Sequence, residues 1–438
     1  GLSIVLGDEL VEASLYSIKS QKNSFAHRMV SYDKFNFDFA GDYFCKLDKN
    51  GVILYQDERR KIILDKMKQI EKENNFEIII DEDLLDEIVA ITEYPTALVG
   101  KFDEEFLKLP TEVIVGSMKE HQRYFEVFKD GKITNNFIVV SNAYTTDFSM
   151  IVAGNEKVLR PRLADAMFFY KNDIKNGLNN EGLKKITFVE GLGSLYEKCE
   201  REAKLVEQFA NMFDMKDDKQ LLQKAIMLSK SDLLTDMVYE FTNLQGLMGY
   251  YYAKLADEDE KVYMAIKEQY LPNGENSDLP SSKFSAIVAL ANKIDTISSL
   301  FSIGMIPTGS RDPFALRRAA SGIVKICIEH KLNLNIKTLF TDEIIEFFNE
   351  RLYKIYSHIN PSVIKAVLST NESDILQIDS KLKALNPIVQ SSSFKEYSTT
   401  FKRVANIIKE LQLNQELDIN TSLFEDDAEK QLYSKYIE

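Results

Sequence analysis

The chain has 438 residues, a formal net charge of −14, and apolar residues at 45% of its positions. This length and composition predict roughly two to four globular domains with sizeable cores. A protein that neutralises many phosphates usually has a basic patch, so the net charge by itself argues against nucleic-acid binding, although it does not exclude it because charge can be segregated. Basic residues nevertheless gather locally, at residues 157–162, 311–318 and 395–403.

The three cysteines and four histidines are scattered, and none has the spacing of a zinc site. Few, widely separated cysteines are typical of structural thiols in a reducing cytoplasm. No apolar run approaches the ~20 residues that span a bilayer, so we expect no membrane partner. The chain begins without an initiator Met, in an apolar run at residues 3–6, which predicts an internal fragment of a longer protein.

Residues 1–150 are predicted to mix strands and helices. Short apolar runs at residues 3–6 and 113–117 favour strands. Helical spacing of apolar residues predicts helices over residues 58–71 and 83–91, the second with an acidic first turn.

A β-hairpin is the clearest local prediction. The dipeptide Asp130-Gly131 lies between two strand-like runs, residues 124–129 and 133–141. Asp-Gly favours the tight turn that joins two antiparallel strands, because both residues tolerate a positive φ.

From Gly154 onward the sequence becomes almost wholly helical. Broad apolar faces predict helices over residues 197–213, 219–239, 283–301 and 313–330. Prolines, a glycine and serines predict a loop over residues 271–282. We expect residues 182–330 to be almost entirely helical and the strands to cluster before Ala143. The predicted fold class is therefore α+β, with several domains.

The helix predicted over residues 313–330 follows a polar turn that ends in Asp312-Pro313. Asp312 suits the N-cap and Pro313 the first helical turn. A helix N-terminus can bind phosphate, but we expect the Asp312 carboxylate to occupy those amides. Arg317 and Arg318 follow in an otherwise apolar helix, so at least one of them should lie partly buried against a carboxylate.

Two segments carry donors and aromatic residues that suit contact with RNA. The candidates are Lys119, His121 and Arg123 within residues 118–125, and Arg160 and Arg162 within residues 154–170. The alternative for both segments is an ordinary solvated face, which is the commoner origin of exposed lysines and arginines.

No constellation of residues predicts catalysis by this chain. His121 is the only histidine in a dense polar motif, and no serine or cysteine beside it forms a nucleophile–base pair. The sequence has no P-loop, and the run at residues 191–196 lacks the third glycine of a dinucleotide loop. We therefore predict no catalytic residue, no metal site and no cofactor on this chain.

Several stretches together resemble one family, the beta subunit of two-chain bacterial glycyl-tRNA synthetases. The most specific is IPTGSRDPFALRR at residues 306–318. The matching stretches follow one another along the chain, at residues 93–125, 154–169, 230–249, 289–318 and 401–408.

The resemblance implies a noncatalytic, tRNA-binding subunit of glycine–tRNA ligase. The alpha subunit would carry the site for ATP, Mg²⁺ and glycine, and two alpha and two beta subunits would form a cytoplasmic heterotetramer that binds tRNA(Gly). The resemblance also implies three domains: residues 1–175 would be a mixed α/β region similar to a synthetase editing module, residues 176–332 an HD-like helical domain, and residues 333–438 the start of a helical anticodon-binding domain. Lys402 and Arg403 then join the candidate tRNA contacts.

The likeness to HD hydrolases implies a pocket that has lost its metal ligands. Those enzymes hold metal through histidines and aspartates, and the matching positions here are Ser231, Asp232 and Asp295. No histidine occurs within residues 122–329, so a transition-metal site is broken. A weaker alternative is a Mg²⁺ site on Asp232, Asp236 and Asp295.

In place of a metal we expect a structural clamp. Two close carboxylates do not both stay ionised without a cation, so Arg317, Arg318 or else Lys293 is predicted to pair with Asp232 or Asp295. Two other functions remain alternatives. One is an HD-type phosphohydrolase, which the missing histidines disfavour; the other is a free-standing RNA-binding scaffold.

Overall fold

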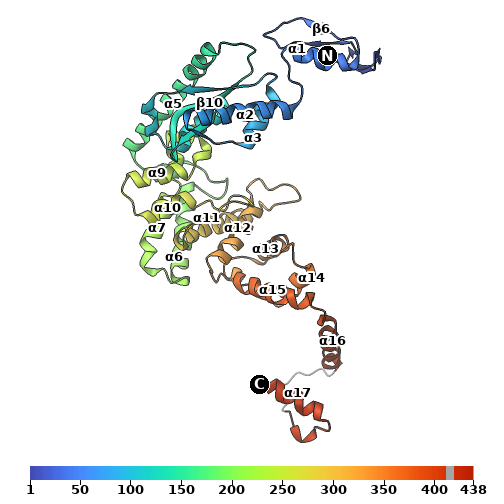
Figure 1. Cartoon of the computed structure of the whole chain (residues 1–438). Coiled ribbons are helices and arrows are strands. Elements are labelled where there is room, and N and C mark those ends of the chain that lie inside the picture. Colours follow the sequence, from blue (N-terminus) through green and yellow to red (C-terminus); the bar gives the residue numbers. More distant parts are fainter. Residues whose placement is uncertain (411–418, 438) are drawn as a thin grey trace. The chain divides into compact units, whose positions relative to one another are not determined.

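The structure, a computed structural model, describes residues 1–410 and 419–437; the side chains of residues 121, 395–397 and 410 lie outside this description. The chain divides into two compact units, Gly1–Ile326 and Cys327–Glu438 (Figure 1). Mixed α/β structure followed by helices confirms the predicted α+β class.

The N-terminal segment consists of short hairpins and one helix. Three two-stranded sheets pair neighbouring strands in antiparallel fashion. The elements are β1 (Val5–Leu6), β2 (Glu9–Leu10), β3 (Ser14–Leu15), β4 (Ile18–Lys19), β5 (Asn23–Phe25), β6 (Lys34–Asn36) and α1 (Ala40–Lys49). The strand predicted over residues 3–6 thus forms at its second half.

A four-stranded antiparallel sheet, in the order β7-β9-β10-β8, organises the next part of this unit. Its strands are β7 (Glu77–Ile78), β8 (Thr96–Lys101), β9 (Phe125–Lys129) and β10 (Lys132–Ser141). Four helices accompany it: α2 (Gln56–Asn74), α3 (Glu82–Ile91), α4 (Thr111–Gln122) and α5 (Ser149–Asn176). The two helices predicted over residues 58–71 and 83–91 are confirmed as α2 and α3.

Side-chain alternation along β10 separates two cores. Phe137 and Val139 belong to the core formed with α4 and α5. Ile138, between them in sequence, belongs to the core formed with α2 and α3. Successive side chains of a strand point to opposite faces, so the sheet lies between the two helical layers (Figure 1).

The β9–β10 hairpin is confirmed. Asp130 has φ 51° and Gly131 has φ 73°, the pair of positive φ angles that a type I′ turn needs. In contrast, the strand predicted at residues 113–117 is wrong, because this run lies inside α4. A short apolar run cannot distinguish a strand from a buried helix by periodicity alone, and Pro110 precedes the first turn of α4.

The rest of the first unit is helical. Its helices are α6 (Leu195–Met212), α7 (Lys219–Leu228), α8 (Asp236–Glu240), α9 (Leu247–Leu255), α10 (Glu260–Glu268), α11 (Lys283–Ser302) and most of α12 (Leu316–Glu329), which ends just past the boundary at Ile326. No strand follows Ser141 in the described residues, as predicted. The single helix expected over residues 219–239 is wrong: the 3-10 turn η4 (Ser231–Leu234) separates α7 from α8.

Helix α11 forms the centre of this helical part. By length and composition it could cross a membrane, but 83% of its most apolar window is buried within the protein. Phe284, Leu290 and Leu300 are all at most 3% exposed. This burial is what a core helix of a folded unit requires.

The sheet and the helical part share one core. Residues of α4 and α5 belong to the same buried cluster as Met237 of α8 and Met248 of α9. At this junction the carboxylate of Asp173 accepts hydrogen bonds from the backbone N–H groups of Asp236 and Met237, both at 3.0 Å. The expected domain boundary between residues 175 and 176 therefore crosses a continuous packed unit.

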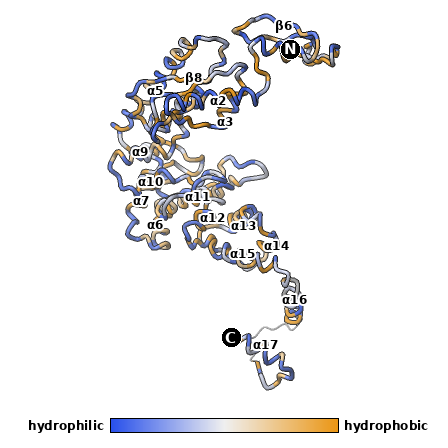
Figure 2. The backbone as a smooth tube through the Cα atoms, in the orientation of Figure 1, coloured by the Kyte–Doolittle hydropathy of each residue, from blue (hydrophilic) through white to orange (hydrophobic). Residues whose placement is uncertain are grey.

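The second unit is helical in the residues that the structure describes. They are η6 (Ile336–Thr338), α13 (Asp342–Ile355), α14 (Pro361–Leu368), α15 (Ile375–Gln390), α16 (Phe394–Glu410), η7 (Thr421–Leu423) and α17 (Asp427–Ile437). Phe348, Ile364 and Leu382 are buried in this unit. Helix α16, unlike these buried positions, has exposed apolar residues: Phe401 and Ile407 are 74% and 59% exposed. Apolar residues of this helix are orange in Figure 2.

Candidate functional site

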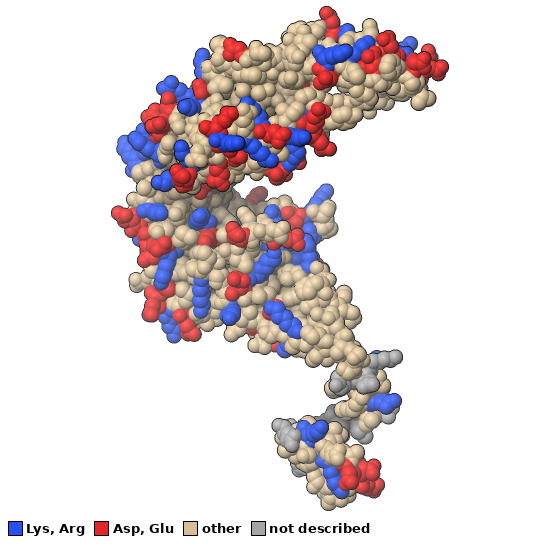
Figure 3. Space-filling view, in the orientation of Figure 1, with Lys and Arg blue, Asp and Glu red and all other residues tan. Residues whose placement is uncertain are grey.

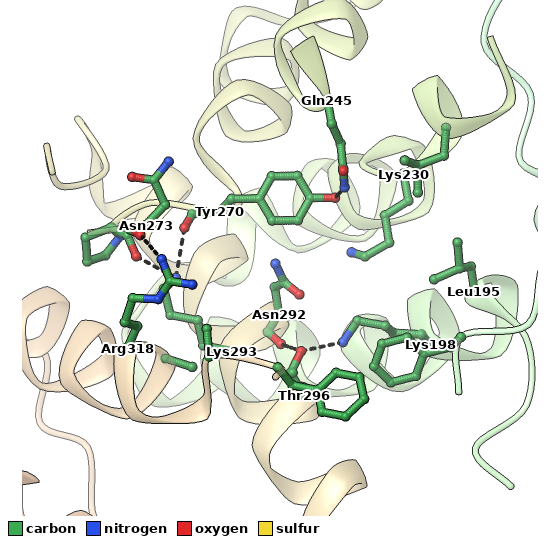
Figure 4. Close-up of a pocket in the computed structure, with 16 residues that line it drawn as sticks. Leu195, Lys198, Lys230, Gln245, Tyr270, Asn273, Asn292, Lys293, Thr296 and Arg318 are labelled. Atoms are coloured by element: carbon green, nitrogen blue, oxygen red, sulfur yellow. Dashed lines mark hydrogen bonds between the residues drawn. The ribbon is translucent and has the colours of Figure 1, made fainter. Parts of the chain in front are cut away.

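The predicted HD-pocket residues lie in the first unit, where α6, η4, α11 and the start of α12 surround a cavity (Figure 4). Asp295 of α11 is 4% exposed. Its carboxylate accepts from Lys198 Nζ at 2.9 Å and from Arg201 Nε at 2.6 Å. Burial opposes ionisation, but the charges of Lys198 and Arg201 hold the pKa of Asp295 below its usual value.

Asp232 of η4 has a different environment and forms no ion pair among the described residues. Its Oδ2 accepts from the backbone N–H groups of Gly246 at 2.5 Å and Gly249 at 3.2 Å. Its Oδ1 has no hydrogen-bond partner among the described residues. Burial raises the pKa of Asp232 to about 6, against the opposing effect of the two amides.

The predicted clamp is therefore wrong in its partners. In the described part of the chain, neither Arg317 nor Arg318 pairs with Asp232 or Asp295. Arg318 Nη1 instead donates to the carbonyl oxygen of Asn273 at 3.2 Å. The cations on Asp295 come from α6, which packs directly against α11.

The turn before α12 behaves mostly as predicted. The Asp312 carboxylate accepts from the backbone N–H groups of Leu316 at 2.8 Å and Arg317 at 3.0 Å. It occupies the amides that would otherwise face an anion, as expected. The helix itself begins at Leu316 rather than at Pro313, because Ala315 has a positive φ of 54°.

The cavity beside these residues is about 350 Å³ in volume, and the charged side chains that line it are all basic. Lys198, Lys230, Lys293 and Arg318 line it, and no aspartate or glutamate of the described residues does. Figure 4 shows Tyr270 and Asn292 between the basic side chains, with Arg318 and Lys293 at one end and Lys198 and Lys230 at the other.

Two of the lining cations, Lys198 and Lys230, pair with a carboxylate that does not itself line the cavity. Glu202 is fully buried and forms ion pairs with Lys198 at 3.0 Å and Lys230 at 2.6 Å. Burial opposes the charge of Lys230, yet Glu202 holds its pKa above the usual value. Lys198, Lys230, Glu202 and Asp295 thus form one buried network of alternating charge.

Lys293 has no such compensation. It is 7% exposed, and its ammonium group donates to the carbonyl oxygens of Tyr270 at 2.9 Å and Pro272 at 3.1 Å. It forms no ion pair with a carboxylate among the described residues. Burial, assisted by the charge of Arg318, lowers the pKa of Lys293 to about 8.

Three of the candidate RNA contacts are engaged with acidic side chains. Lys119 pairs with Asp81. Arg123 pairs with Glu87 at 2.6 Å. Arg160 pairs with Asp103 at 3.1 Å. Each pair is at least partly exposed, so solvent and salt screen it.

The other RNA candidates differ in position. Arg162 is exposed on α5, and Lys402 and Arg403 are exposed on α16. The side chain of His121 lies outside the described residues. On the face drawn in Figure 3, basic and acidic side chains are interspersed over the first unit rather than separated into one broad basic surface.

The sequence interpretation missed the network that holds Asp295. Lys198, Arg201 and Glu202 lie at spacings of three and four residues, which places them on neighbouring positions of one helix face. Cys199 and Val206 on α6 are fully buried. Charges that share a helix face with buried apolar residues were the available signal, because a buried charge needs a partner.

Comparison with known proteins identifies the family. The family model described as "Glycyl-tRNA synthetase beta subunit" matches residues 1–369. The chain belongs to the glycyl-tRNA synthetase beta subunit family. Three relatives, each named glycine–tRNA ligase beta subunit, are 44%, 37% and 38% identical to it, from Helicobacter pylori (strain G27), Clostridioides difficile (strain 630) and Bacillus subtilis (strain 168).

These alignments cover 97% to 99% of the chain and 65% of each relative. The chain therefore spans about two thirds of the length of the family members it matches. The resemblance inferred from residues 306–318 and the other matching stretches is confirmed at the level of the family.

Proposed function

We propose that this chain is a tRNA-binding, noncatalytic part of glycine–tRNA ligase, in which ATP-dependent attachment of glycine to tRNA(Gly) takes place on the alpha subunit. The observation that carries the proposal is the match to the beta subunit family over residues 1–369. The relatives are named as subunits of this ligase. The proposal includes a cytoplasmic assembly of two alpha and two beta subunits, with ATP and Mg²⁺ bound to alpha.

The chemistry of the aspartates disfavours the alternative of an HD-type phosphohydrolase. Asp295 already has two cations on its oxygens, and Asp232 is held by backbone amides. No group of three or more potential metal ligands occurs in the part of the chain that the structure describes. Mg²⁺ prefers several free oxygen ligands, and this site does not provide them.

The division of labour can be tested by glycine-dependent exchange of pyrophosphate into ATP. We expect no exchange with this chain alone, and exchange when an alpha subunit is present, since the activation site is assigned to alpha. Exchange by the isolated chain would refute the noncatalytic assignment.

Coexpression with an alpha subunit, followed by size exclusion, separates a synthetase subunit from a free-standing RNA-binding scaffold. Co-elution of the two chains is expected. Separate elution of the two chains, at protein concentrations well above those used for pyrophosphate exchange, would favour the scaffold alternative.

The contribution of α16 to tRNA binding can be measured through the salt dependence of affinity. Replacing Lys402 and Arg403 together with glutamine should weaken binding and lower the slope of log K against log salt by roughly one for each lost phosphate contact. The matched control replaces Lys61 and Lys68, two exposed residues of α2, with glutamine. Equal affinities and slopes for the two double variants would contradict an RNA contact at Lys402 and Arg403.

A further inference from the structure

We propose that the basic cavity between α6, α11 and α12 binds a phosphate monoester, with Lys293 and Arg318 contacting the phosphate. The ligand class is a nucleoside monophosphate, either free or as the terminal nucleotide of an RNA. This site lies within the first unit, and its existence does not depend on the function proposed above.

The charge balance of the lining is the first argument. In the part of the chain that the structure describes, four basic side chains and no acidic ones line the cavity. Glu202 and Asp295 neutralise Lys198 and Lys230 from outside the lining. Lys293 and Arg318 have no carboxylate partner in the described residues. Lys293 is buried, so an anion in the cavity would supply the partner that a buried cation requires, with the exposed Arg318 beside it.

The geometry of the donors is the second argument. A lysine ammonium has three N–H donors, and Lys293 directs two of them to the carbonyl oxygens of Tyr270 and Pro272. Arg318 donates to the next residue of the same loop, Asn273. The loop thus holds the two cationic groups side by side (Figure 4), and the remaining N–H donors of both groups are available to oxygens of a phosphate.

The position of Lys293 depends on a residue without a side chain. A Cβ on Gly322 of α12 would lie 3.0 Å from Lys293 Cε and 3.2 Å from Lys293 Cδ. The absence of a side chain at Gly322 therefore leaves room for the methylene groups of Lys293 to pass α12 toward the cavity. This is a close approach that any larger residue would disturb.

The remaining lining suits an organic group larger than an ion. A volume of about 350 Å³ is in the range of small-molecule sites, which hold roughly 300–1,000 Å³. Tyr270, Phe188 and Phe314 give aromatic surface, while Asn292 and Gln245 supply amide groups. Aromatic faces and a few polar groups are the features that bind a nucleobase.

Isothermal titration of the chain with AMP, inorganic phosphate and adenosine tests the site. We expect AMP to bind with one-to-one stoichiometry, phosphate to bind more weakly, and neutral adenosine to show no measurable binding. Lys293→Met should weaken AMP binding by about ten-fold or more, because a charge-assisted hydrogen bond is lost. Arg318→Gln changes an exposed side chain and should weaken binding by several-fold without affecting folding.

The matched control is Lys325→Met. Lys325 also lies on α12 and also donates to a loop carbonyl, that of Glu275 at 2.7 Å, but it does not line the cavity. Its variant should bind AMP like the unmodified chain. Absence of AMP binding at millimolar concentration, equal binding of adenosine and AMP, or unchanged binding by both Lys293→Met and Arg318→Gln would overturn the proposal.

A competition experiment distinguishes the two sources of the ligand. A short single-stranded RNA with a terminal phosphate is compared with the same RNA lacking it, and each competes against AMP. Competition that requires the terminal phosphate supports the site and assigns it to an RNA end. Binding of AMP without competition from either RNA supports the site and assigns it to a free nucleotide. Neither result depends on aminoacylation, so the site and the ligase function are tested separately.

Discussion

Replacing Asp295 with asparagine removes the central anion of the buried network. In the native protein its carboxylate accepts from Lys198 Nζ at 2.9 Å and from Arg201 Nε and Nη2 at 2.6 and 3.2 Å. Ser299 Oγ is a further donor, at 3.3 Å. Asparagine keeps the size of the side chain but presents an NH₂ group where an oxygen accepted hydrogen bonds.

The expected loss of stability depends on the partners that Lys198 and Arg201 keep when Asp295 is replaced. Breaking a buried ion pair typically destabilises a protein by about 3–5 kcal/mol, since an uncompensated charge remains. Lys198 is buried but keeps Glu202 at 3.0 Å and Thr296 at 2.8 Å. The side chain of Arg201 is 33% exposed, so water can solvate part of it. We therefore expect a loss near the lower end of that range, about 3 kcal/mol.

Urea unfolding followed by circular dichroism measures this loss, with the slope of the transition checked to confirm that the same surface unfolds. Asp165→Asn is the matched control, because Asp165 is exposed on α5 and forms no ion pair among the described residues. The control should stay within about 0.5 kcal/mol of the native protein. A loss below about 1 kcal/mol for Asp295→Asn would refute the view that Asp295 stabilises two cations.

Three further changes test other features of the first unit. The pKa of Asp232 in the folded protein is about 6, above its unfolded value of ~3.9, so the stability that Asp232 contributes is lost as pH rises from ~4 to ~6, by about 3 kcal/mol in all. Urea unfolding at a series of pH values should show this loss in the native protein and not in Asp232→Asn. The same pH dependence in both proteins would contradict the prediction. Gly100→Ala places a Cβ against the buried ring of Phe137 and should destabilise the sheet by about 1–3 kcal/mol in urea unfolding; an unchanged midpoint would be inconsistent with that contact. Ser194→Ala breaks the capping box with Glu197 and should lower stability by about 1 kcal/mol in thermal unfolding, whereas no change would mean that the cap contributes nothing.

The sequence alone determined features that depend on neighbouring residues. The turn at Asp130-Gly131 follows from the φ angles that these residues accept, and the hairpin forms there. The capping of α12 by Asp312 follows from a carboxylate close to unpaired amides. The helix predicted over residues 283–301 from its broad apolar face forms as α11. The family resemblance was also readable, because the motif at residues 306–318 is contiguous.

Only the tertiary structure decided which charges meet. Lys198 and Asp295 are 97 residues apart, and many carboxylates in the chain could have served as the partner of a buried cation. Residues 113–117 show the same limit for secondary structure, since their apolar run fits a strand or a buried helix, and packing against the sheet selected the helix. The basic cavity arises where α6, α11 and α12 meet a loop whose carbonyl groups hold Lys293 and Arg318. Local hydrogen bonding acts over a few residues, whereas ion pairing and burial depend on distances in space that packing alone establishes.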